Sequence, residues 1–345
     1  MFVEYESMRH FLLPYQFQVF SKLSITLFLI VMTACNNRNN NSEAVKVRQA
    51  EPVGKLAIPP IIYSSTDAGR TWVPFDNGVP HDATVSSFHV ENDKIIAATD
   101  YHGIYSIREG DTKWKRIDED LPMHVDINAI TAIGNTLIIG TQSHGMMISK
   151  NNGMNWEDYP FPYAQTPIRC LYSKGNLLLA GADNGIYKSV DNGLSWEHVY
   201  KGVQVNGFTE LNNKMSAALM NGAIETNDNG LHWNYVYEPH TLHDISSDGE
   251  RLYAMTLGAG LKTSSDGGQA WEVINNGLGT KNLYTFEVKR FGNKIFAAQW
   301  YGIYTSDNFG KDWTIIKSGL PDSTAFTTLE VMNTGLIAGI GLRKK

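Results

Sequence analysis

Cysteine, basic charge and long apolar runs are all scarce in this sequence. Only two of its 345 residues are cysteine, and Cys35 ends an N-terminal export segment, which leaves no pair for a structural disulfide in the folded domain. Lys and Arg total 29 against 35 Asp and Glu, so the net charge of −6 lacks the basic excess typical of nucleic-acid binding. No apolar run reaches the ~20 residues of a membrane-spanning helix, and none has the length and 3.6-residue period of an amphipathic helix. A hydrophobic fraction of 42% nevertheless argues for a folded core.

The apolar segment 23–34, LSITLFLIVMTA, has the length of the hydrophobic region of a signal peptide and follows Lys22. Residues 32–35, MTAC, resemble a bacterial lipobox, in which the cysteine is acylated and becomes the new N-terminus. The resemblance implies a signal peptide over 1–34 and a lipid on Cys35. It also implies an exported bacterial lipoprotein, facing the periplasm or anchored at the outer membrane or cell surface. A plain secretory signal followed by a chance cysteine is the alternative.

The polar residues 35–59 have no apolar period, so we expect a flexible tether between the lipid anchor and a folded domain over 60–345. Membrane contact is then expected through the lipid alone. Both Met1 and Met8 are candidate start residues.

Tryptophan provides the clearest pattern in the chain. Seven of the eight tryptophans recur at intervals of 37 to 42 residues, at Trp72, Trp114, Trp156, Trp196, Trp233, Trp271 and Trp313. A period near 40 indicates an array of similar supersecondary units. Six of these tryptophans end a common octet: STDAGRTW, SKNNGMNW, SVDNGLSW, TNDNGLHW, SSDGGQAW and SDNFGKDW. The copy before Trp114, SIREGDTKW, is degenerate and one residue longer.

The octet S-x-D-x-G-x-x-W resembles the Asp-box of bacterial neuraminidase-type repeats. Its third position is an acid or amide in every regular copy: Asp67, Asn151, Asp191, Asp228, Asp266 and Asn308. We interpret the box as a structural turn. The acid or amide and the Ser/Thr bond nearby backbone N–H groups, and the glycine adopts positive φ. Catalysis by the box acids is disfavoured, because two of the six copies have asparagine there.

Between the boxes, each unit contains four short segments rich in β-branched and aromatic residues, which we label A to D from the inside outwards. The last unit supplies only A and B, FTTLEV and LIAGIG, and its missing C and D, IIYSS and WVPF, flank the first box. We therefore predict an all-β, seven-bladed β-propeller of four-stranded antiparallel blades, in which the two ends of the domain share one blade. Such closure removes exposed sheet edges.

The topology divides the connections between two faces. Strands alternate in direction, so the A–B turns and Asp-boxes share one face (the box face), and the B–C and D–A loops share the other (the loop face). Variable loops on a rigid scaffold are the usual place for binding residues. The candidate ligand-binding residues on the loop face are His102, His124, His144, Arg169, His243, Trp300 and Tyr301.

Aligning the A segments places a mostly polar ring of side chains at one register near the mouth of the axis: Ser86, Asn128, Arg169, Asn206, His243, Tyr284 and Thr327. Arg169 either grips an anionic group or bonds carbonyls of a neighbouring blade. The histidines could also be simply tolerated loop residues. Their spacing predicts no metal site, and no cofactor is expected. Cys170 is interpreted as an inert core thiol.

Asp-box propellers include sialidases, xyloglucan-type glycoside hydrolases, sortilin-like receptors and photosystem II assembly factors, and the fold does not choose among them. The arginine-containing segment typical of sialidases is absent. The similar xyloglucanases use a cleft between two propellers, whereas one is predicted here. The resemblance therefore favours a monomeric, non-enzymatic, lipid-anchored binding or scaffold protein that engages an envelope protein or a glycan. A glycoside hydrolase acting at the same face is the alternative.

Overall fold

The computed structural model describes residues 59–118, 120–122, 125–159, 166–237, 240–279 and 283–342. Cys35, the signal segment and nearly all of the tether lie outside these residues. The described part contains strands and no helix, and accordingly no helical segment in it could span a membrane.

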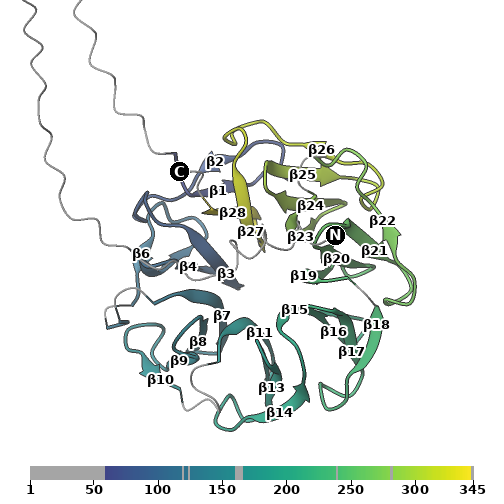
Figure 1. Cartoon of the computed structure of the whole chain (residues 1–345). Helices are drawn as coiled ribbons and strands as arrows, with labels where there is room; N and C mark the ends of the chain where they lie inside the picture. The colour runs from purple at the N-terminus through teal and green to yellow at the C-terminus, as the bar shows by residue number, and fades with distance from the viewer. Residues whose placement is uncertain are drawn as a thin grey trace, which may run out of the picture. The chain divides into compact units, whose positions relative to one another are not determined.

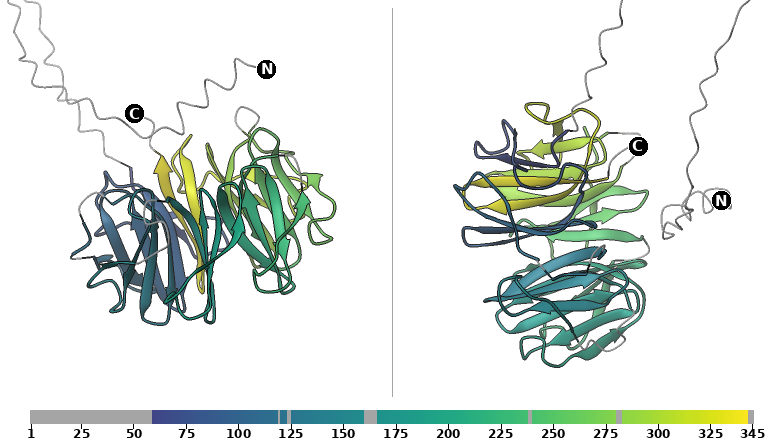
Figure 2. Two further views of the ribbon diagram at one scale, coloured as in Figure 1. Left: turned by 60° about the horizontal axis from the view of Figure 1, so that its bottom comes forward. Right: turned by 90° about the vertical axis from the view of Figure 1, so that its left-hand side faces the viewer.

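Seven four-stranded antiparallel sheets surround one axis, which confirms the predicted seven-bladed propeller (Figure 1). Viewed from the side, the strands of each blade run between the two faces of the ring (Figure 2). We number the blades along the chain, from blade 1 with the sheet β3-β4-β5-β6 to blade 7, which the two ends share.

The innermost (A) strands are β3 (Val85–Glu91), β7 (Ile127–Ile133), β11 (Ile168–Lys174), β15 (Val205–Leu211), β19 (Leu242–Ser247), β23 (Thr285–Phe291) and β27 (Ala325–Met332). The second (B) strands are β4 (Lys94–Thr99), β8 (Thr136–Thr141), β12 (Leu177–Ala182), β16 (Lys214–Leu219), β20 (Leu252–Thr256), β24 (Lys294–Gln299) and β28 (Gly335–Leu342). The third (C) strands are β5 (Gly103–Arg108), β9 (Met146–Ser149), β13 (Gly185–Ser189), β17 (Gly222–Thr226), β21 (Gly260–Ser264), β25 (Gly302–Ser306) and β1 (Ile62–Ser65). The outer (D) strands are β6 (Lys115–Arg116), β10 (Glu157–Asp158), β14 (Glu197–Lys201), β18 (Asn234–Tyr237), β22 (Glu272–Val273), β26 (Thr314–Ile315) and β2 (Val73–Pro74).

Blade 7 closes the ring as the sequence predicts. Its order is β2-β1-β28-β27, and Ile62 of β1 pairs with Gly339 of β28. The second strands form the densest layer, since β12 is buried along its whole length and β4 everywhere except at Lys94. The mainly apolar side chains of these strands are buried between neighbouring sheets, and this burial stabilises the ring.

The regular boxes form the turns that their pattern predicts. In the first, the Ser65 hydroxyl donates to the Asp67 carboxylate at 2.9 Å, and that carboxylate accepts the N–H of Thr71 at 2.9 Å. The Trp72 indole N–H donates to the Gly69 carbonyl at 3.2 Å. The Thr71 hydroxyl is the main group that lowers the pKa of Asp67 to about 2, so this acid stays ionised and bound within the turn.

Every innermost strand contains a β-bulge at the same register, close to the loop face. The bulged residues are Ser86, Asn128, Arg169, Asn206, His243, Phe286 and Thr327. The sequence alignment was wrong in blade 6, where it placed Tyr284 at this position instead of Phe286. The apolar Leu283 and Tyr284 extend the strand pattern LYTFEV beyond the start of β23 at Thr285, and this shifted the alignment by two residues.

Candidate functional site

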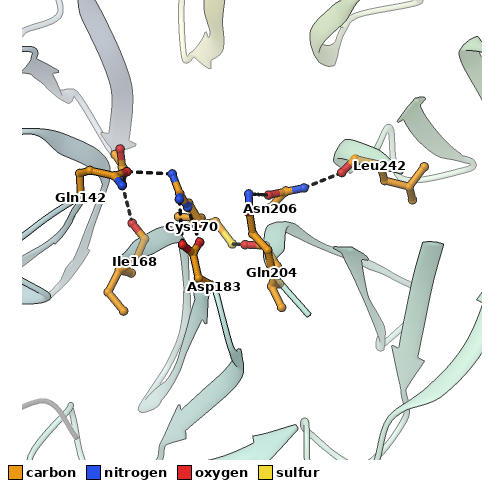
Figure 3. Close-up of polar contacts among 10 residues, drawn as sticks. Gln142, Ile168, Cys170, Asp183, Gln204, Asn206 and Leu242 are labelled. Carbon is orange, nitrogen blue, oxygen red and sulfur yellow. Dashed lines mark hydrogen bonds and ion pairs between the residues drawn. The ribbon is translucent and has the colours of Figure 1, made fainter. Parts of the chain in front are cut away.

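The bulged residues hold neighbouring blades together around the axis. A bulge leaves the preceding carbonyl outside the strand ladder, and in four interfaces a side chain of the previous blade donates to that carbonyl. Three of these contacts are Asn128 Nδ2 to Ile168 O at 3.0 Å, Cys170 Sγ to Val205 O at 3.6 Å and Asn206 Nδ2 to Leu242 O at 2.6 Å (Figure 3). The fourth is Thr327 Oγ1 to Val85 O at 3.5 Å. Much of the polar ring is therefore structural.

Arg169 adds a charged group to these contacts between neighbouring blades. Its guanidinium makes a bidentate ion pair with Asp183 of its own blade, at 2.6 and 2.9 Å, and donates to Gln142 Oε1 of blade 2 at 2.8 Å (Figure 3). Gln142 Oε1 is a carbonyl oxygen of a neighbouring blade, as the second sequence-based alternative predicts, but it belongs to a side chain, and the ion pair with Asp183 was not predicted. The charge of Arg169 is compensated without any ligand.

Four aromatic rings meet at the bulge of blades 5 and 6. Tyr284 lies with its ring centre 4.7 Å from those of His243 and Phe286, and Phe286 stacks on Trp300 at 5.7 Å with 16° between the ring planes. The structure thus joins two of the predicted binding residues, His243 and Trp300, with Tyr284, which the sequence placed in the polar ring, and with Phe286, which the sequence did not single out. We call His243, Tyr284, Phe286 and Trp300 the aromatic cluster.

The polar atoms of the aromatic cluster form one short hydrogen bond. Burial lowers the pKa of His243 to about 4, so its imidazole is neutral at pH 7. Burial and the nearby Asp244 carboxylate raise the pKa of Tyr284, so its hydroxyl keeps its proton. That hydroxyl lies 2.6 Å from His243 Nδ1 and therefore donates to it, which leaves the imidazole proton on Nε2.

The other predicted histidines have local partners. His102 Nδ1 lies 2.9 Å from the Asp100 carbonyl, and its Nε2 lies 3.4 Å from Asp82. His144 Nδ1 lies 3.0 Å from the Ser143 hydroxyl in the same turn. His124 lies outside the described residues, and Tyr301 is half-buried in the loop after β24. Within the described ranges no group of three or more His, Cys, Asp and Glu residues is arranged to hold a metal ion.

A charged group on the innermost strands of blades 5 to 7 was missed from the sequence. The Lys289 ammonium donates to Glu330 at 2.7 Å, and their side chains keep 27% and 26% of their surface exposed. Both belong to the strands nearest the axis, where their side chains are partly exposed. The sequence does contain a signal for this ion pair, because the segments E-V-K in β23 and L-E-V in β27 place charged residues in otherwise mainly apolar inner strands.

Two acids near this ion pair hold protons unusually strongly. Burial raises the pKa of Asp244 to about 7 and that of Glu287 to about 8. Glu287 accepts the backbone N–H of Leu329 in blade 7. Burial opposes the charge on Lys289, but the neighbouring carboxylates of Glu330 and Glu287 raise its pKa overall. The inner strands of blades 5 and 6 therefore combine aromatic rings with carboxylic acids that are partly protonated at neutral pH.

No protein-family model matches this chain, and no curated protein does either. Its fold is similar to many solved propellers. The structure of YCF48 bound to a D1 peptide has a TM-score of 0.62 and 17% identity over 75% of this chain and 91% of that one. A GH74 xyloglucanase from Xanthomonas campestris has a TM-score of 0.61 and 14% identity, but only 50% of its length is covered. The WD40 propeller domain of Doa1 has a TM-score of 0.57 and 13% identity, over 75% of this chain and 90% of that one. These similarities define the class as a seven-bladed propeller, and at such identities they define nothing finer.

Proposed function

We propose that this chain is a binding or scaffold protein that engages an envelope protein or a glycan on the loop face, near the axis of the propeller. The aromatic cluster carries this proposal. Half-buried rings beside hydrogen-bonding groups supply the apolar and polar contacts that binding sites combine. The similarity to YCF48 bound to a D1 peptide supports protein binding as one use of such a ring.

The test removes the most peripheral ring of the cluster. The purified protein is applied to a glycan array and to a peptide array of envelope-protein segments, together with Trp300→Ala. We expect the retained signal to fall at least tenfold in Trp300→Ala while the melting temperature stays within a few degrees. The matched control is Leu194→Ala, which removes a side chain that is 79% exposed on the box face. Equal binding by wild type and Trp300→Ala would contradict the proposal.

The location proposed for this activity is the bacterial cell envelope, with a lipid on Cys35 and the protein acting as a monomer. The export pattern of residues 23–35 supports it. Mass spectrometry of the membrane fraction is expected to find an acylated N-terminal peptide beginning at Cys35. Cys35→Ser should abolish this peptide and release the protein. An unprocessed or unmodified wild-type chain would contradict the lipid anchor.

A glycoside hydrolase remains the second candidate because of one observation. Asp244 and Glu287 have raised pKa values, as a carboxylic acid needs to donate a proton at neutral pH. Release of reducing sugar from soluble polysaccharides, abolished by Asp244→Asn or Glu287→Gln with the fold intact, would establish hydrolysis. The absence of release from such a panel would favour the binding proposal.

A further inference from the structure

The segment 106–114 is the one divergent copy of the box, with Arg108 at the position of the acid or amide in the six regular copies. In each regular box two successive residues adopt positive φ, as Asn152 (60°) and Gly153 (94°) do, whereas within 106–114 only Gly110 does (93°). The divergent copy therefore forms a different turn. Its arginine does not replace the box acid within that turn.

The side chains of the divergent turn reach neighbouring segments instead. Glu109 accepts the backbone N–H groups of Asn333 at 2.7 Å and Thr334 at 3.1 Å, which ties blade 1 to blade 7. Arg108 donates to Asp93 at 2.6 Å, in the A–B turn of its own blade. Both side chains of that ion pair are more than half exposed, so the pair is weak and a stronger anionic partner can replace it.

A cavity of about 420 Å³ lies beside Arg108, between blades 1 and 2 on the box face. This volume falls within the range of small-ligand pockets, ~300–1,000 Å³. Its lining combines buried apolar side chains, such as Ile96 and Leu137, with the amide side chains of Asn92, Asn135 and Asn152. A smaller depression of about 130 Å³ shares Arg108 and Lys94 with it.

Two groups in the larger cavity lack full compensation. His89 Nε2 is buried and has no hydrogen-bond partner, and burial lowers the pKa of this imidazole, so it is neutral. Burial, and then the charge of Arg108, lowers the pKa of Lys94. The Lys94 ammonium has a long hydrogen bond of 3.4 Å to Asn152 Oδ1. A buried polar atom without a partner is costly, so a small shift of the His89 imidazole that brings Nε2 to a ligand atom in the cavity is favourable.

The charged residues that line the two spaces indicate that each space suits a different kind of ligand group. The smaller depression brings four basic residues against one acid: Lys94, Arg108, Lys113 and Lys115 against Asp111. This excess stands out in a chain of net charge −6. The larger cavity is balanced, since exposed Glu91 and Asp93 also line it. An anionic group therefore fits the smaller space, and an uncharged hydrogen-bonding body fits the larger one.

We propose that the cavity between blades 1 and 2, together with the smaller depression beside it on blade 1, binds a small organic anion with a hydroxyl-bearing body, that is, an acidic saccharide. Arg108 and Lys94 hold its acidic group. His89 and the asparagine amides bond its hydroxyls. The site is on the opposite face from the aromatic cluster, so the two act independently.

The test is calorimetric titration of the full protein with glucuronate, glucose 6-phosphate and glucose 6-sulfate. Glucose serves as the neutral match, and sodium sulfate as the bare anion. At least one acidic sugar is expected to bind ten times more tightly than glucose and than sulfate. Affinities for all acidic sugars equal to that for glucose would overturn the proposal. Sulfate binding as tight as the best sugar would overturn the saccharide assignment.

Variants then locate the site. The double substitution Arg108→Gln/Lys94→Gln should weaken the best acidic sugar at least tenfold, and His89→Phe should weaken it several-fold. Lys317→Gln removes a charge from an exposed side chain outside the site and should change nothing. Trp300→Ala, which tests the proposed function, should also leave this binding unchanged. Undiminished binding by the folded double variant, checked by its melting curve, would overturn the location.

Discussion

The innermost strands of blades 2 to 4 and those of blades 5 and 6 share one bulged backbone, yet their side chains do different things. In blades 2 and 4 the register carries Asn128 and Asn206, which bond the next blade, and in blade 3 Cys170, directly after the bulged Arg169, does so. In blades 5 and 6 it carries aromatic rings followed directly by acids. The bulge supplies a position near the axis, and the local residue decides whether that position bonds the next blade or contributes a ring to the aromatic cluster.

The largest effect is expected from opening the ring, because blades 2 to 4 and blades 5 and 6 all depend on its closure. Deleting Leu329–Lys345 removes β28, so β1 loses its partner strand. We expect complete loss of the cooperative unfolding transition in calorimetry, because every blade packs on two others. Deleting only residues 343–345 leaves β28 whole and should change little. A truncated protein with the wild-type melting curve would refute ring closure.

A more local test concerns the contact between blades 4 and 5, where Gly207 of blade 4 faces Asp244 of blade 5. A Cβ on Gly207 would lie only 1.9 Å from Asp244 Oδ1. Gly207→Ala should therefore reduce the free energy of unfolding by about 1–3 kcal/mol. The same register in blade 2 already holds Ala129, so alanine itself is acceptable there.

The double variant Gly207→Ala/Asp244→Ala provides the control for that substitution. With the carboxylate removed, the added methyl group should cost less than about 0.5 kcal/mol relative to Asp244→Ala alone. A cost that does not depend on residue 244 would show that the two blades are not coupled through this contact.

The pH dependence of the free energy of unfolding should reveal the contribution of the buried acids in blades 5 and 6. Asp244 has its pKa raised to about 7, so the folded protein holds a proton that the unfolded chain releases at a lower pH. Stability is therefore lost as the pH rises from about 5 to 8. Asp244→Asn should reduce this loss by roughly 2 kcal/mol, measured by urea unfolding at both pH values. Asp307→Asn, at an exposed carboxylate, should leave the loss unchanged.

The smallest expected effect concerns one closure contact of blades 2 to 4. Asn206→Ala removes the 2.6 Å hydrogen bond to the Leu242 carbonyl and should cost about 1 kcal/mol in the free energy of unfolding. Ser86→Ala serves as the match, because this bulged residue bonds Ala98 within its own blade at 3.2 Å. If both substitutions lower the free energy of unfolding equally, hydrogen bonds between blades stabilise the protein no more than those within a blade at this register.

Sequence reasoning recovered the architecture almost completely and the site in part. The blade count, the shared blade and the box turns were predictable because Ser, Asp, Gly and Trp recur at fixed offsets. The candidate binding residues were chosen only because they lie on the loop face. His102 and His144 were therefore grouped with His243, although each of them has local partners. The misplaced Tyr284 shows the same weakness, since a strand's first residue depends on contacts outside the strand.

The sequence by itself determined how the chain turns and repeats, because these depend on residues a few positions apart whose chemistry is the same in every copy. Only the tertiary structure decided which side chains meet across blades. The aromatic cluster, the proton-holding acids and the cavity beside Arg108 all join residues from strands about 40 positions apart. Their distances and burial follow from the radius and register of the closed ring, which no local pattern encodes.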